Sequence, residues 1–367
     1  MIELPQQLSE RDVPPFRPSL AQKIGVCALT PFALGSQVLV GSLPVTAAVA
    51  FDALVTDSLE PSVAPDTKLI SSPETCEKSS FVDITVSSMG LPVAQYMAAN
   101  TREQVEAHGG CVVATSYGTA YTLDTSRELT KKMLQTIETV SRPGETKGVV
   151  FHAASFGVYP TVEMISSDAY KKAVADGKIK TTGLILESTP SNSDSVKDPT
   201  AKTLIELSKH GSFRIGKGML GLINTFSTLE GGHDLTSVNT WDDIATNTSA
   251  TSTRLTVNQL RRIGEGIPPL VTSNDQIPAL KDVPVYYIGS NDDAVVQNSL
   301  ARQEFAEKTG TDVVYLKTST LPGSFNHAGS WLVTDYDRAG YREAIQTALD
   351  DIAPPAPPAK SFPKKPI

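Results

Sequence analysis

Residues 149–159 read VVFHAASFGVY, and this stretch decides how the chain folds. An apolar run of strand character ends abruptly in small residues, with Ser155 among them and Gly157 two positions later. A strand that turns sharply into a helix needs small residues two places before and after the apex, because larger side chains would collide there. The segment 153–157, AASFG, has this form and predicts a nucleophile elbow with Ser155 at its apex.

A second stretch has the same small-x-Ser-x-Gly form. Residues 114–118 read ATSYG and also end an apolar run, with Ser116 in the place of the nucleophile. A pentapeptide of this kind is a weak signal by itself, so residues elsewhere in the chain must decide between Ser116 and Ser155.

Apolar runs alternate with segments of helical spacing along most of the chain. Strands are expected at 50–57, 67–72, 79–92 (closing on a Gly-Leu-Pro turn), 111–118, 147–155, 180–189, 283–290 and 312–318. Helices are expected at 92–110, 126–140, 157–167, 298–310 and 337–352. Continuous apolar strands that alternate with amphipathic helices predict a doubly wound, mostly parallel α/β sheet covered on both faces.

The helix expected at 126–140 shows the pattern most clearly. Ser126 is the expected N-cap, and one face carries Leu129, Met133, Ile137 and Val140. This apolar face should pack on the sheet.

The pattern divides the chain into five parts. The expected α/β core comprises 52–189 and 282–352, and residues 190–281 interrupt it after the sixth strand. This insertion is rich in Ser, Thr, Asn and Asp, and we expect it to form a lid or cap. Residues 1–23 form a polar leader, and residues 353–367 are a Pro-rich, extended tail.

The segment 24–51 contains no charged residue and is long enough to cross about 30 Å of hydrocarbon as a helix. Basic residues precede it and acidic residues follow it: Arg11, Arg17 and Lys23, then Asp52, Asp57 and Glu60. Residues 48–50, AVA, have the small-x-small form of a signal-peptidase site. We expect a membrane anchor or an export signal. The alternative is that the segment, which contains Pro31 and Pro44, packs as core in a cytoplasmic protein.

Composition excludes some partners and leaves others open. The net charge of −8 argues against a nucleic-acid partner, because phosphates require a basic face. Three cysteines are too few for a disulfide scaffold or a cysteine-built zinc site. Cys76 and Cys111 can pair if the domain is exported, and otherwise they are two buried thiols. Their spacing does not choose between these, and the sequence does not give the oligomeric state.

The order of polar residues downstream decides between the two serines. The strand at 283–290 is followed at once by Asp292, and the loop at 321–331 carries His327 just before the last helix. A nucleophilic serine needs a base within hydrogen-bond reach and a carboxylate that orients the base. In a doubly wound sheet such residues lie on loops at the carboxyl ends of later strands. The order Ser155, Asp292, His327 meets this requirement.

With these motifs the chain resembles the α/β-hydrolase superfamily over roughly residues 50–352, apart from the insertion. The resemblance rests on AASFG as the elbow, GSNDDAVV (289–296) as the acid turn and NHAG (326–329) as the histidine loop. It implies that Ser155 is the nucleophile, Asp292 the acid and His327 the base, and it places Ser116 one strand too early. It also implies an oxyanion hole made by the backbone N–H of Phe156 and that of Gly90 or Leu91.

Several alternatives stay open. The acid could be Asp293 or Glu187 in place of Asp292, Ser155 could be a packing residue, and His327 could be an ordinary loop histidine. The remaining histidines are interpreted as structural or solvated: His152 within the elbow strand, His108 and His210 at helix ends, and His233 in the insertion. Residues 216–221, GKGMLG, match a dinucleotide motif but follow no convincing strand. We therefore expect no cofactor and no metal.

The resemblance implies a serine hydrolase that cleaves carboxylic esters or related small acyl compounds through an acyl-enzyme. An acyltransferase on the same scaffold, or a catalytically inactive hydrolase-like binding protein, is the alternative.

Overall fold

The computed structural model describes residues 64–87, 90–118, 121–197, 202, 205–206, 253–267, 280, 282–290, 293, 295–318 and 335–353. All of them belong to one compact unit, Ala48–Ile367. The leader, the apolar segment 24–51, the strand expected at 50–57, most of the insertion 190–281 and all but the first residue of the tail lie outside this description. No helix in the described ranges is long and apolar enough to cross a membrane.

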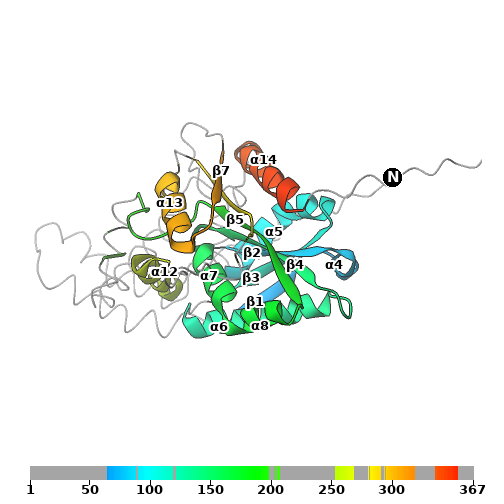
Figure 1. Cartoon of the computed structure of the whole chain (residues 1–367). Coiled ribbons are helices and arrows are strands. Elements are labelled where there is room, and N and C mark those ends of the chain that lie inside the picture. Colours follow the sequence, from blue (N-terminus) through cyan, green and yellow to red (C-terminus); the bar gives the residue numbers. More distant parts are fainter. Residues whose placement is uncertain are drawn as a thin grey trace, which may run out of the picture. The chain divides into compact units, whose positions relative to one another are not determined.

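Seven described strands form one sheet in the order β1-β3-β2-β4-β5-β6-β7 (Figure 1). Their bounds are β1 Asp66–Leu69, β2 Phe81–Val86, β3 Gly110–Ser116, β4 Lys147–Ala154, β5 Ile179–Glu187, β6 Val285–Gly289 and β7 Val313–Lys317. β1 is antiparallel to its neighbour, and all the other pairs are parallel. The mostly parallel sheet expected from the sequence is confirmed, with β4 at its centre.

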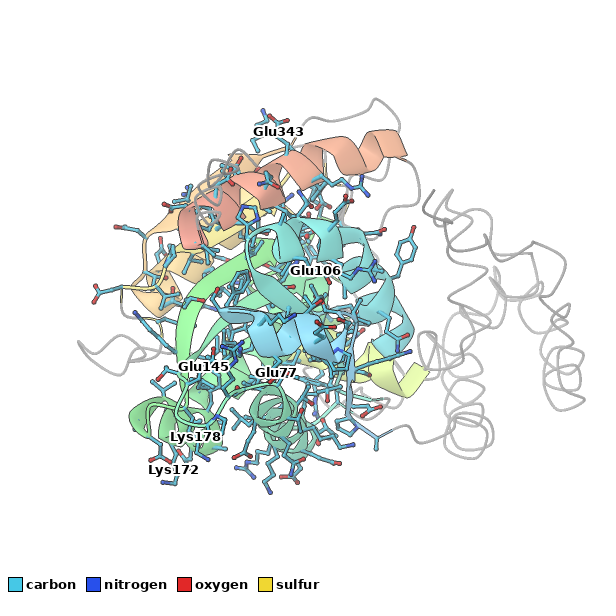
Figure 2. All side chains as sticks on the ribbon, turned by 90° about the vertical axis from the view of Figure 1, so that its right-hand side faces the viewer. Glu77, Glu106, Glu145, Lys172, Lys178 and Glu343 are labelled. Carbon is cyan, nitrogen blue, oxygen red and sulfur yellow. A yellow bond between two sulfur atoms is a disulfide. The ribbon has the colours of Figure 1, made fainter. Side chains whose placement is uncertain are left out.

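Helices cover both faces of the sheet. α5 (Gly90–Ala107) and α14 (Asp335–Ile352) pack together on one face. The other face carries α6 (Leu123–Thr139), α7 (Val158–Ser166) and α8 (Asp168–Ala175), together with α4 (Pro73–Lys78), α12 (Thr253–Glu265) and α13 (Asn298–Thr309). Exposed charged side chains such as Glu77, Lys172 and Glu343 point away from the sheet (Figure 2). The doubly wound fold class is therefore confirmed.

The helix expected at 126–140 begins earlier than the sequence suggested. Its N-cap is Thr122, which exchanges hydrogen bonds with Thr125 in a capping box. The prediction that Ser126 is the N-cap is wrong, because the Ser126 hydroxyl is directed to Glu163. The predicted apolar face is confirmed, since all four of its residues are buried in one cluster: Leu129, Met133, Ile137 and Val140.

Two short helices were not expected. In α4, Ser72 caps the helix and Pro73 follows as its first residue. In α8, Ser167 accepts a hydrogen bond from the N–H of Tyr170. Both helices are short and bury only one or two residues each, too few to reveal a repeating apolar face, so only the capping residues indicate them in the sequence.

Cys76 and Cys111 form a disulfide that joins α4 to β3. Of the two interpretations of these cysteines, the structure has the bonded one. The buried Lys147 ammonium donates to the carbonyl oxygens of Cys76 and Ser79, near the end of the same helix. α4 is thus fixed to both β3 and β4.

Candidate active site

The turn at the end of β4 has the geometry that a nucleophile elbow requires. β4 ends at Ala154, the residues Ser155–Gly157 form a single 3₁₀ turn, and α7 follows directly. Ser155 has φ = 50°, a left-handed backbone that non-glycine residues rarely adopt. Such strain costs on the order of 1–3 kcal/mol and gathers at active sites. Ser155 is half-buried, whereas its neighbours Ala154 and Phe156 are buried.

Gly157 explains why a small residue follows two places after the serine. A Cβ at this position would lie 2.2 Å from the carbonyl oxygen of Val86 and 3.5 Å from the carbonyl carbon of Ser87. No side chain fits there without moving the backbone. The turn is therefore packed directly against the carboxyl end of β2.

The same contact brings the two expected oxyanion donors to neighbouring strands. Phe156 follows Ser155 in the turn after β4, while Gly90 is the first residue and Leu91 the second of α5, which follows β2. β2 and β4 are hydrogen-bonded neighbours. The first N–H groups of a helix have no partner within the helix itself, which is why helix N-termini can bind anions.

Ser116 lacks this geometry. It is the last residue of β3, its backbone pairs with Asp66, and it is not among the positive-φ residues. Its hydroxyl accepts a hydrogen bond from the N–H of Gly118 at 3.1 Å. Of the two small-x-Ser-x-Gly stretches, only the one at Ser155 forms a strained apex.

Two of the expected site residues, Asp292 and His327, lie outside the described residues. The neighbouring Asp293 is buried, and both of its carboxylate oxygens accept hydrogen bonds from residues that follow it closely in the chain. Oδ1 accepts from the N–H groups of Val295 at 2.7 Å and Val296 at 2.9 Å, and Oδ2 accepts from the Asn298 amide at 3.1 Å. Asp293 thus shapes the turn after β6.

Glu187, the other alternative for the acid, points into the layer between the sheet and the α5–α14 pair. It ends β5, is fully buried and forms an ion pair with Nε2 of His152 on β4. Asp83 on β2 belongs to the same buried group and accepts a hydrogen bond from the Thr85 hydroxyl at 3.1 Å. These side chains alternate with apolar residues that face α5 and α14.

The pKa values in this group follow from burial and from mutual charge. Burial raises the pKa of Asp83 to about 6, against a smaller opposing effect of the His152 imidazolium. For His152 burial acts to lower the pKa, but the carboxylates of Glu187 and Asp83 outweigh it, so the net shift is upward. The carboxylates of Glu187 and Asp83 thus favour the charged form of His152 within the strand.

The other histidines lie away from the turn or outside the described residues. His108 directly follows α5 and links it to α14 through a 2.9 Å contact between Nε2 and the Asp350 carboxylate. His210, His233 and the GKGMLG motif fall in undescribed parts of the chain. Within the ranges that the structure covers, no group of three or more His, Cys, Asp or Glu side chains could hold a metal ion.

Glu163 was not expected to have a role from the sequence; it lies on α7 and connects this helix to the start of α6 and to α12. One signal was available: Glu163 is the only carboxylate between Lys147 and Asp168. A single charged residue in an apolar helix is expected to have a charged or hydrogen-bonding partner, because burying an unpaired charge is costly.

No protein-family model matches the chain, and no curated protein matches it either. The chain is similar in fold to solved α/β-hydrolases. One is the esterase EaEST from Exiguobacterium antarcticum, 14% identical, with a TM-score of 0.43, covering 79% of this chain and 95% of that one. Another is an α/β hydrolase from Sphaerobacter thermophilus, 12% identical, with a TM-score of 0.43, covering 80% and 99%. A third is the carboxylesterase CesB from Bacillus subtilis, 13% identical, with a TM-score of 0.41, covering 84% and 97%. At such low identity the likeness concerns the fold alone.

Proposed function

We propose that the protein is a serine hydrolase that cleaves carboxylic esters, or related small acyl compounds, through an acyl-enzyme. Ser155 is the nucleophile, His327 the general base and Asp292 the acid that orients it. The observation that carries this proposal is the left-handed backbone of Ser155 between β4 and α7, together with the contact of Gly157 with Val86.

The reaction has two halves. Ser155 Oγ attacks the ester carbonyl carbon while His327 takes the hydroxyl proton, and the tetrahedral oxyanion is stabilised by backbone N–H groups. His327 then gives the proton to the leaving alkoxide, and the C–O bond to the alcohol breaks. Water attacks the acyl-enzyme with His327 again as base, and the acid product leaves with Ser155 restored.

We propose Asp292 as the acid because residues 289–292, GSND, have the Gly-x-x-Asp form of an acid turn directly after β6. Asp293 accepts hydrogen bonds within its own loop, and Glu187 is paired with His152 inside the sheet layer. Both alternative carboxylates therefore have structural partners in the described part of the chain.

The oxyanion donors we propose are the N–H of Phe156 and that of Gly90 or Leu91. In their support, Gly157 contacts Val86 at the end of β2, and α5 begins only four residues after Val86, at Gly90.

We also propose that the protein works outside the cytoplasm. The Cys76–Cys111 disulfide suits an oxidising compartment, and the apolar segment 24–51 supplies an export signal or an anchor. Two measurements test this location. Cells are separated into soluble, membrane and exported fractions, and free thiols are alkylated before the protein is run on a non-reducing gel. Protein found only in the cytoplasm, with Cys76 and Cys111 both as free thiols, would contradict it.

Hydrolysis of p-nitrophenyl butyrate by matched serine variants tests the activity. Ser155→Ala should lower kcat by at least about 1,000-fold, because the nucleophile is lost. Ser116→Ala should stay within about twofold of the unsubstituted protein. If activity survives in Ser155→Ala but is lost in Ser116→Ala, the nucleophile is Ser116 on β3. If the folded protein hydrolyses no ester at all, the proposal is wrong.

A further inference from the structure

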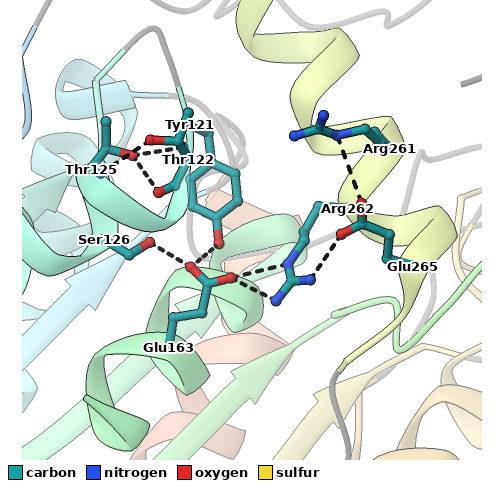
Figure 3. A network of polar contacts seen from close by, with 8 residues as sticks. All are labelled: Tyr121, Thr122, Thr125, Ser126, Glu163, Arg261, Arg262 and Glu265. Carbon is teal, nitrogen blue, oxygen red and sulfur yellow. Dashed lines mark hydrogen bonds and ion pairs between the residues drawn. The ribbon is translucent and has the colours of Figure 1, made fainter. Parts of the chain in front are cut away.

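A carboxylate on the helix that follows Ser155 is the hub of a polar network (Figure 3). Oε2 of Glu163 accepts hydrogen bonds from the hydroxyls of Tyr121 at 2.6 Å and Ser126 at 2.5 Å. Oε1 accepts two more from the Arg262 guanidinium, from Nε at 3.0 Å and from Nη2 at 2.7 Å. One carboxylate therefore joins the start of α6, the middle of α7 and the end of α12.

The pair of Glu163 and Arg262 is well shielded from water. The side chains are 8% and 19% exposed, and Nη1 of Arg262 also donates to Glu265 at 2.9 Å. Burial acts to lower the pKa of Arg262, but the Glu163 carboxylate outweighs this and raises it, so the guanidinium stays charged. Charge-assisted bonds of this kind, formed by two nitrogens at once, fix direction as well as distance.

Through Tyr121 the network contacts Phe156, the residue that follows Ser155. The Tyr121 ring meets the Phe156 ring edge-on, with centroids 5.0 Å apart and planes at 88°. The Tyr117 ring lies 5.9 Å from Phe156, and the Tyr159 ring stacks on it at 4.9 Å. Phe156 is thus enclosed by three tyrosine rings, and each such aromatic pair contributes about 0.5–1.5 kcal/mol.

α12 reaches the same aromatic group by a second contact. The Gln259 side-chain amide donates to the Tyr117 hydroxyl at 2.8 Å, and Leu260 and Ile263 pack on the apolar core beside it. α12 is therefore bound to Tyr117 directly and to Tyr121 through Glu163.

We propose that Glu163 is a positioning residue for the oxyanion donor. By binding Arg262 and Tyr121 together, it couples the docking of α12 to the position of the Phe156 N–H. This inference rests on the proposed function, in which that N–H binds the oxyanion. The carbonyl oxygen gains its charge only in the transition state, so a displaced donor lowers kcat and leaves KM nearly unchanged.

Adjacent arginines on α12 provide a matched test. Arg262→Gln removes the pair with Glu163, whereas Arg261→Gln removes an exposed pair with Glu265 at 3.8 Å on the same helix. For each variant, kcat and KM for p-nitrophenyl butyrate and the melting temperature are measured. All assays are run well below the lowest of these melting temperatures. We expect Arg262→Gln and Glu163→Gln to lower kcat about tenfold with KM within about twofold, since full removal of one donor costs about 100-fold or more. Arg261→Gln should change both constants by less than about twofold.

Two gentler variants keep the test valid if Arg262→Gln does not fold. Arg262→Lys keeps the charge and loses the two-nitrogen contact, and Tyr121→Phe keeps the ring on Phe156 and loses the hydroxyl that binds Glu163. Both should lower kcat several-fold without raising KM. Equal kcat in all these variants and in Arg261→Gln, or a rise in KM alone, would overturn the inference while ester hydrolysis itself persists. If the unsubstituted protein does not hydrolyse the ester, the proposed function fails as well.

Discussion

Ser155 and Ser188 leave neighbouring strands at the same level of the sheet, and both have a left-handed backbone. Ala154 and Glu187 pair in register across β4 and β5, and the two serines follow them with φ of 50° and 46°. Strain at two adjacent strand ends is unusual for residues that carry a Cβ. The two strained serines lie at the carboxyl edge of the sheet, where doubly wound folds have their ligand-binding and active sites.

The strain at Ser155 predicts opposite effects of glycine at the two candidate serines. Ser155→Gly should be more stable than Ser155→Ala by about 1 kcal/mol, because glycine adopts positive φ without a steric cost. At Ser116, in a strand, Ser116→Gly should be less stable than Ser116→Ala by about 0.5–1 kcal/mol. Urea unfolding of the four variants measures this. The same order of stability at both positions would contradict a strained Ser155.

Gly157→Ala should lower both stability and activity. The added methyl group would meet the Val86 carbonyl oxygen at 2.2 Å, and overpacking of this kind costs about 1–3 kcal/mol. Gly144→Ala is the control, because nothing lies within 4 Å of a Cβ there, although its φ of 79° also favours glycine. We expect kcat to fall at least about tenfold in Gly157→Ala and to be unchanged in Gly144→Ala. Equal ester hydrolysis by both variants would argue against a close contact of the turn with β2.

Asp83 predicts a pH-dependent stability. Its pKa rises from 3.8 to about 6 on burial, so the folded protein holds this proton more tightly than the unfolded chain. The resulting stabilisation is complete below pH 3.8 and is lost as the pH rises through 6. Asp83→Asn cannot ionise, so its stability relative to the unsubstituted protein should increase between pH 4 and pH 7, by up to about 3 kcal/mol. Urea unfolding at pH 4.5 and pH 7.5 measures the difference, and a difference independent of pH would contradict the account.

The disulfide predicts a loss of stability when it is removed. The bond closes a segment of 35 residues between α4 and β3. In the chain-entropy account this contributes about 3–4 kcal/mol. The double variant Cys76→Ser/Cys111→Ser should therefore unfold at lower denaturant concentration, and a reducing agent should produce a similar shift in the unsubstituted protein. Unchanged midpoints in both experiments would show that the two thiols are not bonded.

The parts of the fold that the sequence predicted are those with a local pattern. The buried strands are continuous apolar runs, and the face of α6 with Met133 and Ile137 repeats at helical spacing. The sharp turn at Ser155 was also local, because small residues on both sides signal it.

The parts that escaped prediction depend on contacts between distant residues. Glu163 and Arg262 are 99 residues apart, and His152 and Glu187 are 35 apart, so no local pattern joins them. Ser126 was assigned as a cap because its sequence context fits one, but its hydroxyl binds a carboxylate on another helix. Side-chain partners of this kind are decided by packing.

Reaction with a fluorophosphonate probe, followed by mapping of the adduct by mass spectrometry, tests the central claim most directly. The probe phosphonylates a serine hydroxyl only where a base and an oxyanion hole activate it. We expect one adduct, on Ser155, which disappears in Ser155→Ala and persists in Ser116→Ala. An adduct on Ser116, or a folded protein that remains unlabelled, would contradict it.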